Sequence, residues 1–282
     1  MFDTENLHWS FNHNRGNQKD FGSSVQQTLS CYVKTADDGI ARHSTESTFV
    51  STYNVLPNFW RGYHPRSDRT ANGDLRIGRF VLGRRLGEGG RWQYSVHSEN
   101  STSGENLQAV FQCMNDTPRT VIDSWQIDAA NTAGNLHKQF ACSGQITSTD
   151  DDGGREVRLS VNGLEFVSGC YRGELSITCP WALYDVIPLI HSGTTDTSEG
   201  IEIALLDDLE KLKSPVHVEF LESIDLKVSD EEQVMQLSGY CVYGNGMAPS
   251  YWWVDSRSNV VISSTIFQTL VLRNARTQAG VE

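Results

Sequence analysis

The chain has 282 residues, of which 38% are hydrophobic and 10% aromatic, and it contains seven tryptophans. This composition supplies a large apolar core and excludes a wholly disordered chain, and all-β units of about 200–250 residues often form one domain. The formal net charge of −12 at pH 7 opposes phosphate backbones, whose binding depends on Lys and Arg. We therefore expect no nucleic-acid partner.

The amino-terminal segment is predicted to be an arm. Residues 1–24 mix Asn, His, Asp, Gly and Ser without a period. They lack the pattern of a signal peptide, and the sequence has no run of about 18 apolar residues that could span a membrane. We expect a cytoplasmic location and no membrane span. Residues 25–276 are predicted to form a single antiparallel β domain, or two fused halves meeting near 130–140, and 277–282 a tail.

Six cysteines lie far apart, and none forms a C-x-x-C pair. This usage favours buried thiols in a reducing compartment, although an even count also permits disulfides.

Alternation of apolar and polar residues predicts strands from residue 25 onward. In the first half they cover 25–33, 47–56, 75–82, 92–97, 107–113, 121–127, 140–146 and 157–161. The segment Gly87-Glu88-Gly89-Gly90 joins two of these strands. It is predicted to be a hairpin turn and not a phosphate loop, because no helix follows and Lys-Ser/Thr is absent.

One helix signal interrupts the strands. Pro180 suits the first turn of a helix, and Trp181, Tyr184 and Ile187 recur at helical spacing. Pro188 is expected to end or kink this helix. Strands are then predicted at 201–205, 216–228, 235–243, 251–254 and 260–273, with 206–214 as a connector. The expected fold is mainly β: a large curved antiparallel sheet, a half-barrel or barrel, with one short helix packed inside or against it.

The segment Tyr251-Trp252-Trp253-Val254-Asp255, followed by Asn259-Val260-Val261-Ile262, resembles the last hairpin of lipoprotein-carrier-like open β-barrels and of uncharacterised bacterial relatives. The resemblance covers about the last quarter of the chain. It implies a strongly curved sheet around a short helix, with an apolar concave face able to take an acyl chain or another hydrophobic ligand. A shared fold does not carry a shared site.

The long irregular stretch 57–74 carries the first candidate site, because loops of this length tend to be functional or mobile. His64 could act as a general acid or base, and the neighbouring arginines could hold an anionic group. The alternative is a loop plug whose aromatic rings pack on the sheet. The candidate residues of this loop are Trp60, Arg61, Tyr63, His64 and Arg66.

A second set of aromatic residues could line a ligand cavity from two sides. It comprises Trp181 and Tyr184 on the predicted helix and Tyr251 and Trp253 on the hairpin. Aromatic residues at such positions also serve as ordinary core packing, and Asp255 at a turn commonly binds its own backbone.

No cofactor or metal is expected. His97 and His217 occupy polar strand faces, and neither HxH nor HExxH spacing occurs. Asp150-Asp151-Asp152 lacks the alternate spacing of a calcium-binding EF-hand loop.

Three functions remain open. The first is a non-catalytic module that binds a small hydrophobic or amphipathic ligand in the concavity of the sheet. The second is a metal-independent lyase, hydrolase or isomerase in which His64 is the acid or base and Arg61 or Arg66 binds an anionic substrate group. The third is a protein-interaction domain.

Overall fold

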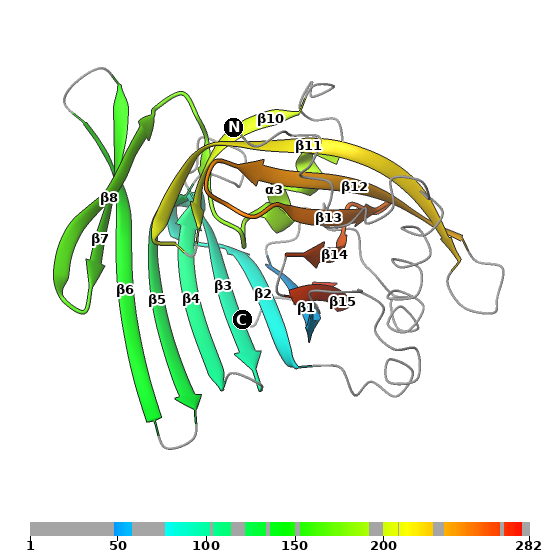
Figure 1. The fold of residues 1–282 in the computed structure, drawn as a ribbon, viewed down its shortest axis with the longest axis horizontal. Coiled ribbons are helices and arrows are strands. Elements are labelled where there is room, and N and C mark those ends of the chain that lie inside the picture. Colours follow the sequence, from blue (N-terminus) through cyan, green and yellow to red (C-terminus); the bar gives the residue numbers. More distant parts are fainter. Residues whose placement is uncertain are drawn as a thin grey trace.

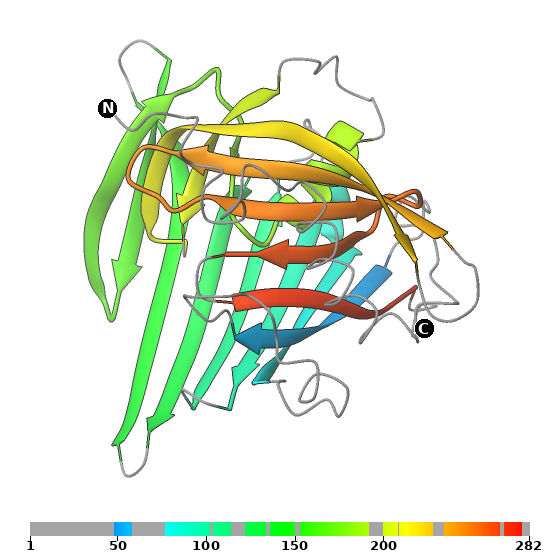
Figure 2. The same cartoon turned by 45° about the vertical axis from the view of Figure 1, so that its right-hand side comes forward.

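The computed structural model describes residues 48–57, 77–101, 104–113, 122–133, 136–149, 153–191, 200–207, 209–227, 234–265 and 268–277. In this part of the chain, fifteen strands form one sheet that curves around the helix α3 (Leu183–His191) (Figures 1 and 2). All ladders are antiparallel except the short parallel pair of β9 and β10. The predicted fold class, a large curved antiparallel sheet with one short helix, is confirmed.

The first eight strands are β1 (Thr48–Pro57), β2 (Gly78–Leu86), β3 (Trp92–Asn100), β4 (Glu105–Cys113), β5 (Ile122–Ala133), β6 (Leu136–Ser148), β7 (Gly154–Val161) and β8 (Leu164–Arg172). The other seven are β9 (Ile177–Thr178), β10 (Ile201–Asp207), β11 (Lys211–Lys227), β12 (Val234–Gly244), β13 (Ser250–Asp255), β14 (Val260–Ser264) and β15 (Gln268–Thr277). A 3-10 turn at Glu88–Gly90 joins β2 to β3, which confirms the predicted hairpin.

The sheet consists of two meanders joined by one ladder. Strands β1 to β8 follow one another in space, as do β9 to β15, and β1 pairs with β15. The order leaves β8 and β9 as the two ends of the sheet. In Figure 1 the first meander forms one wall and β10 to β15 arch across it, with α3 between the two. Residues from both meanders and α3 form one apolar core.

The predicted final strand is wrong in its extent. Residues 260–273 form two strands, β14 and β15, and not one. A turn separates them, in which the Thr265 amide donates to the Gln268 carbonyl at 2.9 Å. The sequence changes at this point to the polar residues Ser263, Ser264 and Thr265, a turn signal that the analysis of alternation did not use.

The predicted connector 206–214 is also wrong. It is the turn of a hairpin, because β10 continues to Asp207 and β11 begins at Lys211. Asp207 lies directly opposite Lys211 in the ladder, and opposite charges at facing positions support a hairpin. Leu209, at the turn, is buried and has a φ of 55°.

Two local features depart from the predicted pattern. Pro188 lies inside α3 and does not end it; only three helical residues follow, so the backbone hydrogen bond that proline removes falls near the end of the helix. Glu222, which interrupts the apolar alternation of its strand, lies at a register shift next to Phe220. Such a bulge reverses the faces to which the following residues point.

The strand β8 was missed by the periodicity analysis. It follows β7 through a two-residue turn, Asn162-Gly163, whose φ angles of 49° and 83° are both positive. Asn-Gly is the preferred pair for such a hairpin turn.

Four of the five described cysteines, Cys113, Cys142, Cys179 and Cys241, are buried free thiols as expected, whereas Cys170 is exposed. Within the described residues, no helix is long and apolar enough to cross a membrane.

Gly144 on β6 is required by close packing against Trp125. A Cβ at this position would lie 2.1 Å from Cζ2 of the Trp125 ring, so Gly144→Ala forces the ring or the strand to shift. We expect a loss of about 1–3 kcal/mol in the free energy of unfolding, measured by urea titration. The neighbouring Ser143→Ala, at an exposed position, is the control and should cost less than about 0.5 kcal/mol. Equal effects of the two changes would contradict the packing argument.

Candidate functional site

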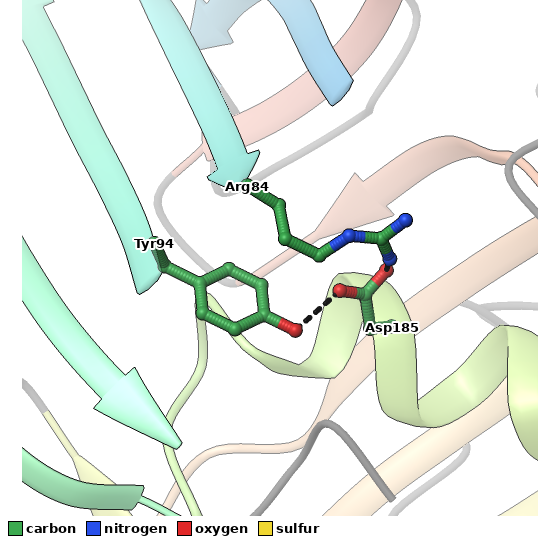
Figure 3. A network of polar contacts seen from close by, with 3 residues as sticks. All are labelled: Arg84, Tyr94 and Asp185. Atoms are coloured by element: carbon green, nitrogen blue, oxygen red, sulfur yellow. Dashed lines mark hydrogen bonds and ion pairs between the residues drawn. The ribbon is translucent and has the colours of Figure 1, made fainter. Parts of the chain in front are cut away.

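A buried ion pair attaches α3 to the sheet. Nη1 of Arg84, on β2, donates to Oδ1 of Asp185, on α3, at 2.9 Å, and the two side chains are 3% and 4% exposed. The Tyr94 hydroxyl, on β3, donates to Oδ2 of the same carboxylate at 2.6 Å (Figure 3). Both carboxylate oxygens therefore accept hydrogen bonds from the sheet. The sheet face that carries Arg84 and Tyr94 is called the inner face below.

Aromatic rings surround the charged groups of this network. The Arg84 guanidinium lies 4.9 Å from the ring centroid of Trp92 and 5.7 Å from that of Phe49, where ring quadrupoles favour a cation. Burial, and then the charge of Asp185, raise the pKa of Tyr94 well above its usual value. The phenol therefore stays protonated and remains a hydrogen-bond donor.

Tyr184, a predicted ligand-binding residue, lies in the core. Its ring centroid is 4.9 Å from those of Tyr53 and Trp252, and its hydroxyl is 2.6 Å from Oγ of Ser263 on β14. These contacts link α3 to both meanders. The side chain is 1% exposed, so it holds the helix in place and presents no free surface.

The other aromatic candidates do not meet at one place. Trp181 is partly buried, with its ring 6.5 Å from that of Phe111. Trp252 faces Tyr184, and because successive side chains in a strand point to opposite faces, Tyr251 and Trp253 point to the outer face, where they are buried. The Asp255 carboxylate accepts two amide hydrogen bonds from its own turn.

The candidates of the long loop lie outside the described residues, so the acid–base hypothesis built on them stays a prediction. They are Trp60, Arg61, Tyr63, His64 and Arg66.

Among the described residues, no group of three or more His, Cys, Asp or Glu side chains could hold a metal ion. His97 is 2.9 Å from a Glu99 oxygen at the surface. His217 stacks on Tyr243 and lies 3.6 Å from a Glu202 oxygen.

The buried thiols are poor nucleophiles. Burial raises the pKa of Cys142 to about 11 and that of Cys179 and Cys241 to about 12, and the thiolate is the reactive form.

His191, at the end of α3, lies 3.1 Å from the Tyr240 hydroxyl, and burial lowers the pKa of the imidazole. The sequence analysis did not single out this pair.

Apolar side chains of the first meander form rows on the inner face. Each row consists of residues that lie opposite one another on successive strands. One row runs from Tyr94 and Phe111 to Leu159 and Phe166. The next ends at Val161 opposite Leu164, and the third contains Leu107, Ala129 and Phe140 as consecutive partners. Such partners and their diagonal neighbours are within side-chain reach.

The side chains in these rows become more exposed to solvent towards β8, the strand at the end of the sheet. Leu107, Ala129, Phe140 and Val161 are partly buried, whereas Phe166 and Leu164 are 47% and 74% exposed. We call these six residues the inner apolar strip. Large exposed apolar side chains are uncommon enough on a folded protein that a contiguous set marks a binding surface. The sequence analysis missed the strip because it missed β8.

Polar groups border the strip. One row beyond Leu107, the ladder partners Asn100, Glu105 and Asn131 follow on the same face. On the side of β8, the turn between β10 and β11 lies against the sheet, where the Ser168 hydroxyl donates to the Glu210 carbonyl. The strip is therefore bounded by polar side chains at one border and by this turn at another.

The described geometry defines a mainly β protein with an open, barrel-like sheet. No protein-family model matches the chain, and no curated protein matches it either. Among solved structures, it is similar to a beta-barrel-like protein of the domain of unknown function DUF1849 from Brucella abortus, at a TM-score of 0.49 and 11% identity, over 83% of this chain and 99% of that one. The dehydratase domain from the CurF module of curacin polyketide synthase has a TM-score of 0.13 and 9% identity, over 92% and 81% of the two chains.

Neither likeness is strong enough to support a statement about function. The lipoprotein-carrier resemblance stays a prediction. The functional argument therefore rests on the residues themselves.

The buried pair can be tested by a double-mutant cycle. Arg84→Met and Asp185→Leu should each cost about 3–5 kcal/mol of unfolding free energy, because each leaves a buried charge without its opposite. The double variant should lose clearly less than the sum of the two. Urea unfolding followed by tryptophan fluorescence measures all four proteins, and additive losses would show that the pair is not coupled.

The Tyr94 phenol should make the protein sensitive to alkali. Its pKa is raised in the folded state, so its contribution to stability is complete below the unfolded value of about 10 and is lost as the pH rises above it. Tyr94→Phe should be less stable at pH 8, but its stability should fall less steeply between pH 10 and 11, by up to about 1.4 kcal/mol per pH unit. Parallel pH profiles would exclude this role.

Proposed function

We propose that this protein binds a small hydrophobic or amphipathic ligand on the inner apolar strip, without catalysing a reaction. The observation that carries the proposal is the exposure of Leu164 and Phe166 on the inner face of the sheet. These side chains continue the rows that form the core. They therefore occupy core-like positions on the sheet, but no other part of the protein covers them fully. A ligand that supplied this cover would gain about 25 cal/mol for each Å² of apolar surface removed from water.

The surroundings of the strip support a ligand with a polar end. Asn100, Glu105 and Asn131 lie one row beyond the apolar residues and can hydrogen-bond to a head group while the apolar part follows the strip. Ligand sites commonly combine an apolar lining with a few polar groups at one end. The concavity of the sheet also suits a small molecule better than a flat protein surface.

A second candidate function is protein interaction through the edge of β8. Val167 is 50% exposed and lies opposite Arg158, on the outer face. Exposed apolar side chains on both faces of an end strand are a feature of edges that receive another strand. The enzymatic alternative with His64 has no support from the described residues.

Phe166 and Val167 form a matched pair for testing these two functions. They are adjacent in the chain and almost equally exposed, but they point to opposite faces. Phe166→Ser should weaken binding of dansyl-labelled undecanoic acid at least about tenfold, since a buried aromatic ring contributes about 1.5–3 kcal/mol. Val167→Ser should leave the affinity unchanged. Fluorescence titration measures both, and native mass spectrometry of the purified wild type would identify a ligand that copurifies.

Two results would contradict the proposal. If the wild-type protein binds no probe, the strip is not a ligand site. If Val167→Ser weakens binding as much as Phe166→Ser does, the binding surface is the β8 edge, and the interaction function is favoured.

A further inference from the structure

The two ends of the inner apolar strip differ in chemistry. One end is Leu107 on β4, which lies one row from the polar side chains Asn100 and Glu105. The other end is Phe166 on β8, whose neighbour Leu164 is the most exposed apolar side chain of the strip. A ligand with one polar and one apolar end that follows the strip therefore has a defined direction, with its polar end next to Leu107.

Leu212, on β11, closes the apolar end. The inner-face position after Phe166 is Gly169, because Ser168 is the extra residue of a bulge. A Cβ added to Gly169 would lie 3.1 Å from Cδ2 of Leu212, so the leucine side chain occupies the space above the glycine. The Ser168 hydroxyl donates to the Glu210 carbonyl of the same hairpin, which lies beside β8 in Figures 1 and 2. Leu212 therefore stands in the path of a chain that continues along β8 beyond Phe166.

The ladders give the distance between the two ends of the strip. Leu107 and Phe166 are on β4 and β8, four strand spacings apart in the sheet. The row of Phe166 meets β4 at Phe111, four residues from Leu107. With about 4.8 Å between strands and about 3.4 Å per residue along a strand, the diagonal on a flat sheet is about 23 Å. The strip lies on the concave face, where side-chain ends converge, so its length is closer to about 20 Å.

This length corresponds to an alkyl chain of moderate size. An extended chain advances about 1.3 Å per carbon, because C–C bonds of about 1.5 Å meet at tetrahedral angles, so about 16 carbons cover the strip. A shorter chain leaves part of the strip in water and forfeits the favourable transfer of each missing methylene. A longer chain gains no further apolar contact, because its last carbons meet Leu212 or turn into solvent.

We infer that the ligand is an unbranched amphiphile and that the strip measures the length of its chain, with Phe166 and Leu164 in contact with the methyl end and Leu212 setting the limit at about 16 carbons. This inference rests on the proposed function and names the ligand class of the same site. It makes Phe166 and Leu212 determinants of specificity, whereas Leu107 contributes to the affinity for chains of every length.

Isothermal titration calorimetry with monomeric straight-chain fatty acids, from octanoic to eicosanoic acid, tests the length limit in the wild type. The affinity should rise about two- to fourfold with each added methylene up to about 16 carbons. Between hexadecanoic and eicosanoic acid it should change less than about twofold in total, because the added carbons find no further apolar surface.

Three variants locate the two ends of the chain. Phe166→Ser should weaken the binding of hexadecanoic acid at least about tenfold but that of decanoic acid less than about twofold, since a chain of about 13 Å ends before Phe166. Leu107→Ser should weaken the binding of both acids by the same factor. Leu212→Ala should move the limit to chains about two carbons longer. Val167→Ser, on the outer face, is the control and should change neither affinity. The dansyl ring lengthens undecanoic acid, so that probe also reaches Phe166.

The outcomes separate this inference from the proposed function. An affinity that keeps rising up to eicosanoic acid, or an equal loss for both acids in Phe166→Ser, would overturn the length limit and leave the ligand site intact. Binding of the dansyl probe without binding of any fatty acid would also overturn the inference alone, because the ligand would then not be an unbranched chain. If the wild type binds neither the acids nor the probe, both the inference and the proposed function fail.

Discussion

The position of α3 depends on the ion pair between Arg84 and Asp185. Burial of two charges is costly, and their attraction offsets this cost only when the remaining hydrogen-bonding groups are satisfied. Here Tyr94 provides the second hydrogen bond to the carboxylate, and aromatic rings cover the guanidinium. Because this geometry admits little variation, it selects one orientation of the helix on an otherwise apolar surface.

The helix in turn divides the inner face into a covered and an uncovered part. Tyr184 joins the helix to Tyr53 of one meander and Trp252 of the other, so the region beneath it is solid core. Towards β8, the same rows of apolar residues continue beyond the helix. The inner apolar strip is therefore a continuation of the core, which explains why its residues have the composition of a strand interior.

Much of the fold could be predicted from alternation, because this period survives wherever one strand face is buried. The helix near Tyr184 was found from helical spacing, and the hairpin around Glu88–Gly90 from a glycine-rich segment between two predicted strands. The prediction failed where a short polar segment marked a reversal, as at Ser263–Thr265, and where a bulge changes the face, as at Glu222. Residues that are distant in sequence but in contact, such as Arg84 and Asp185, leave no local sequence pattern. Neither the buried ion-pair network nor the inner apolar strip could therefore be predicted from the sequence. Asn162-Gly163 was a signal for β8 that could have been used.

The ladder between β1 and β15 makes the order of the strands in the sheet a circular permutation of their order along the chain. Phe49 lies opposite Thr277, so the first and last described strands along the chain are neighbours in the sheet. By contrast, β8 and β9 are consecutive along the chain but are the two ends of the sheet. A circular permutation that joined the end of β15 to the start of β1 and opened the chain between β8 and β9 would place all fifteen strands in sequence order. Every ladder would then be a contact between consecutive strands, and such low contact order is associated with faster folding. Among the described strands, the natural order therefore leaves the β1–β15 ladder, between the first and last strands along the chain, as the one pairing between strands that are not consecutive.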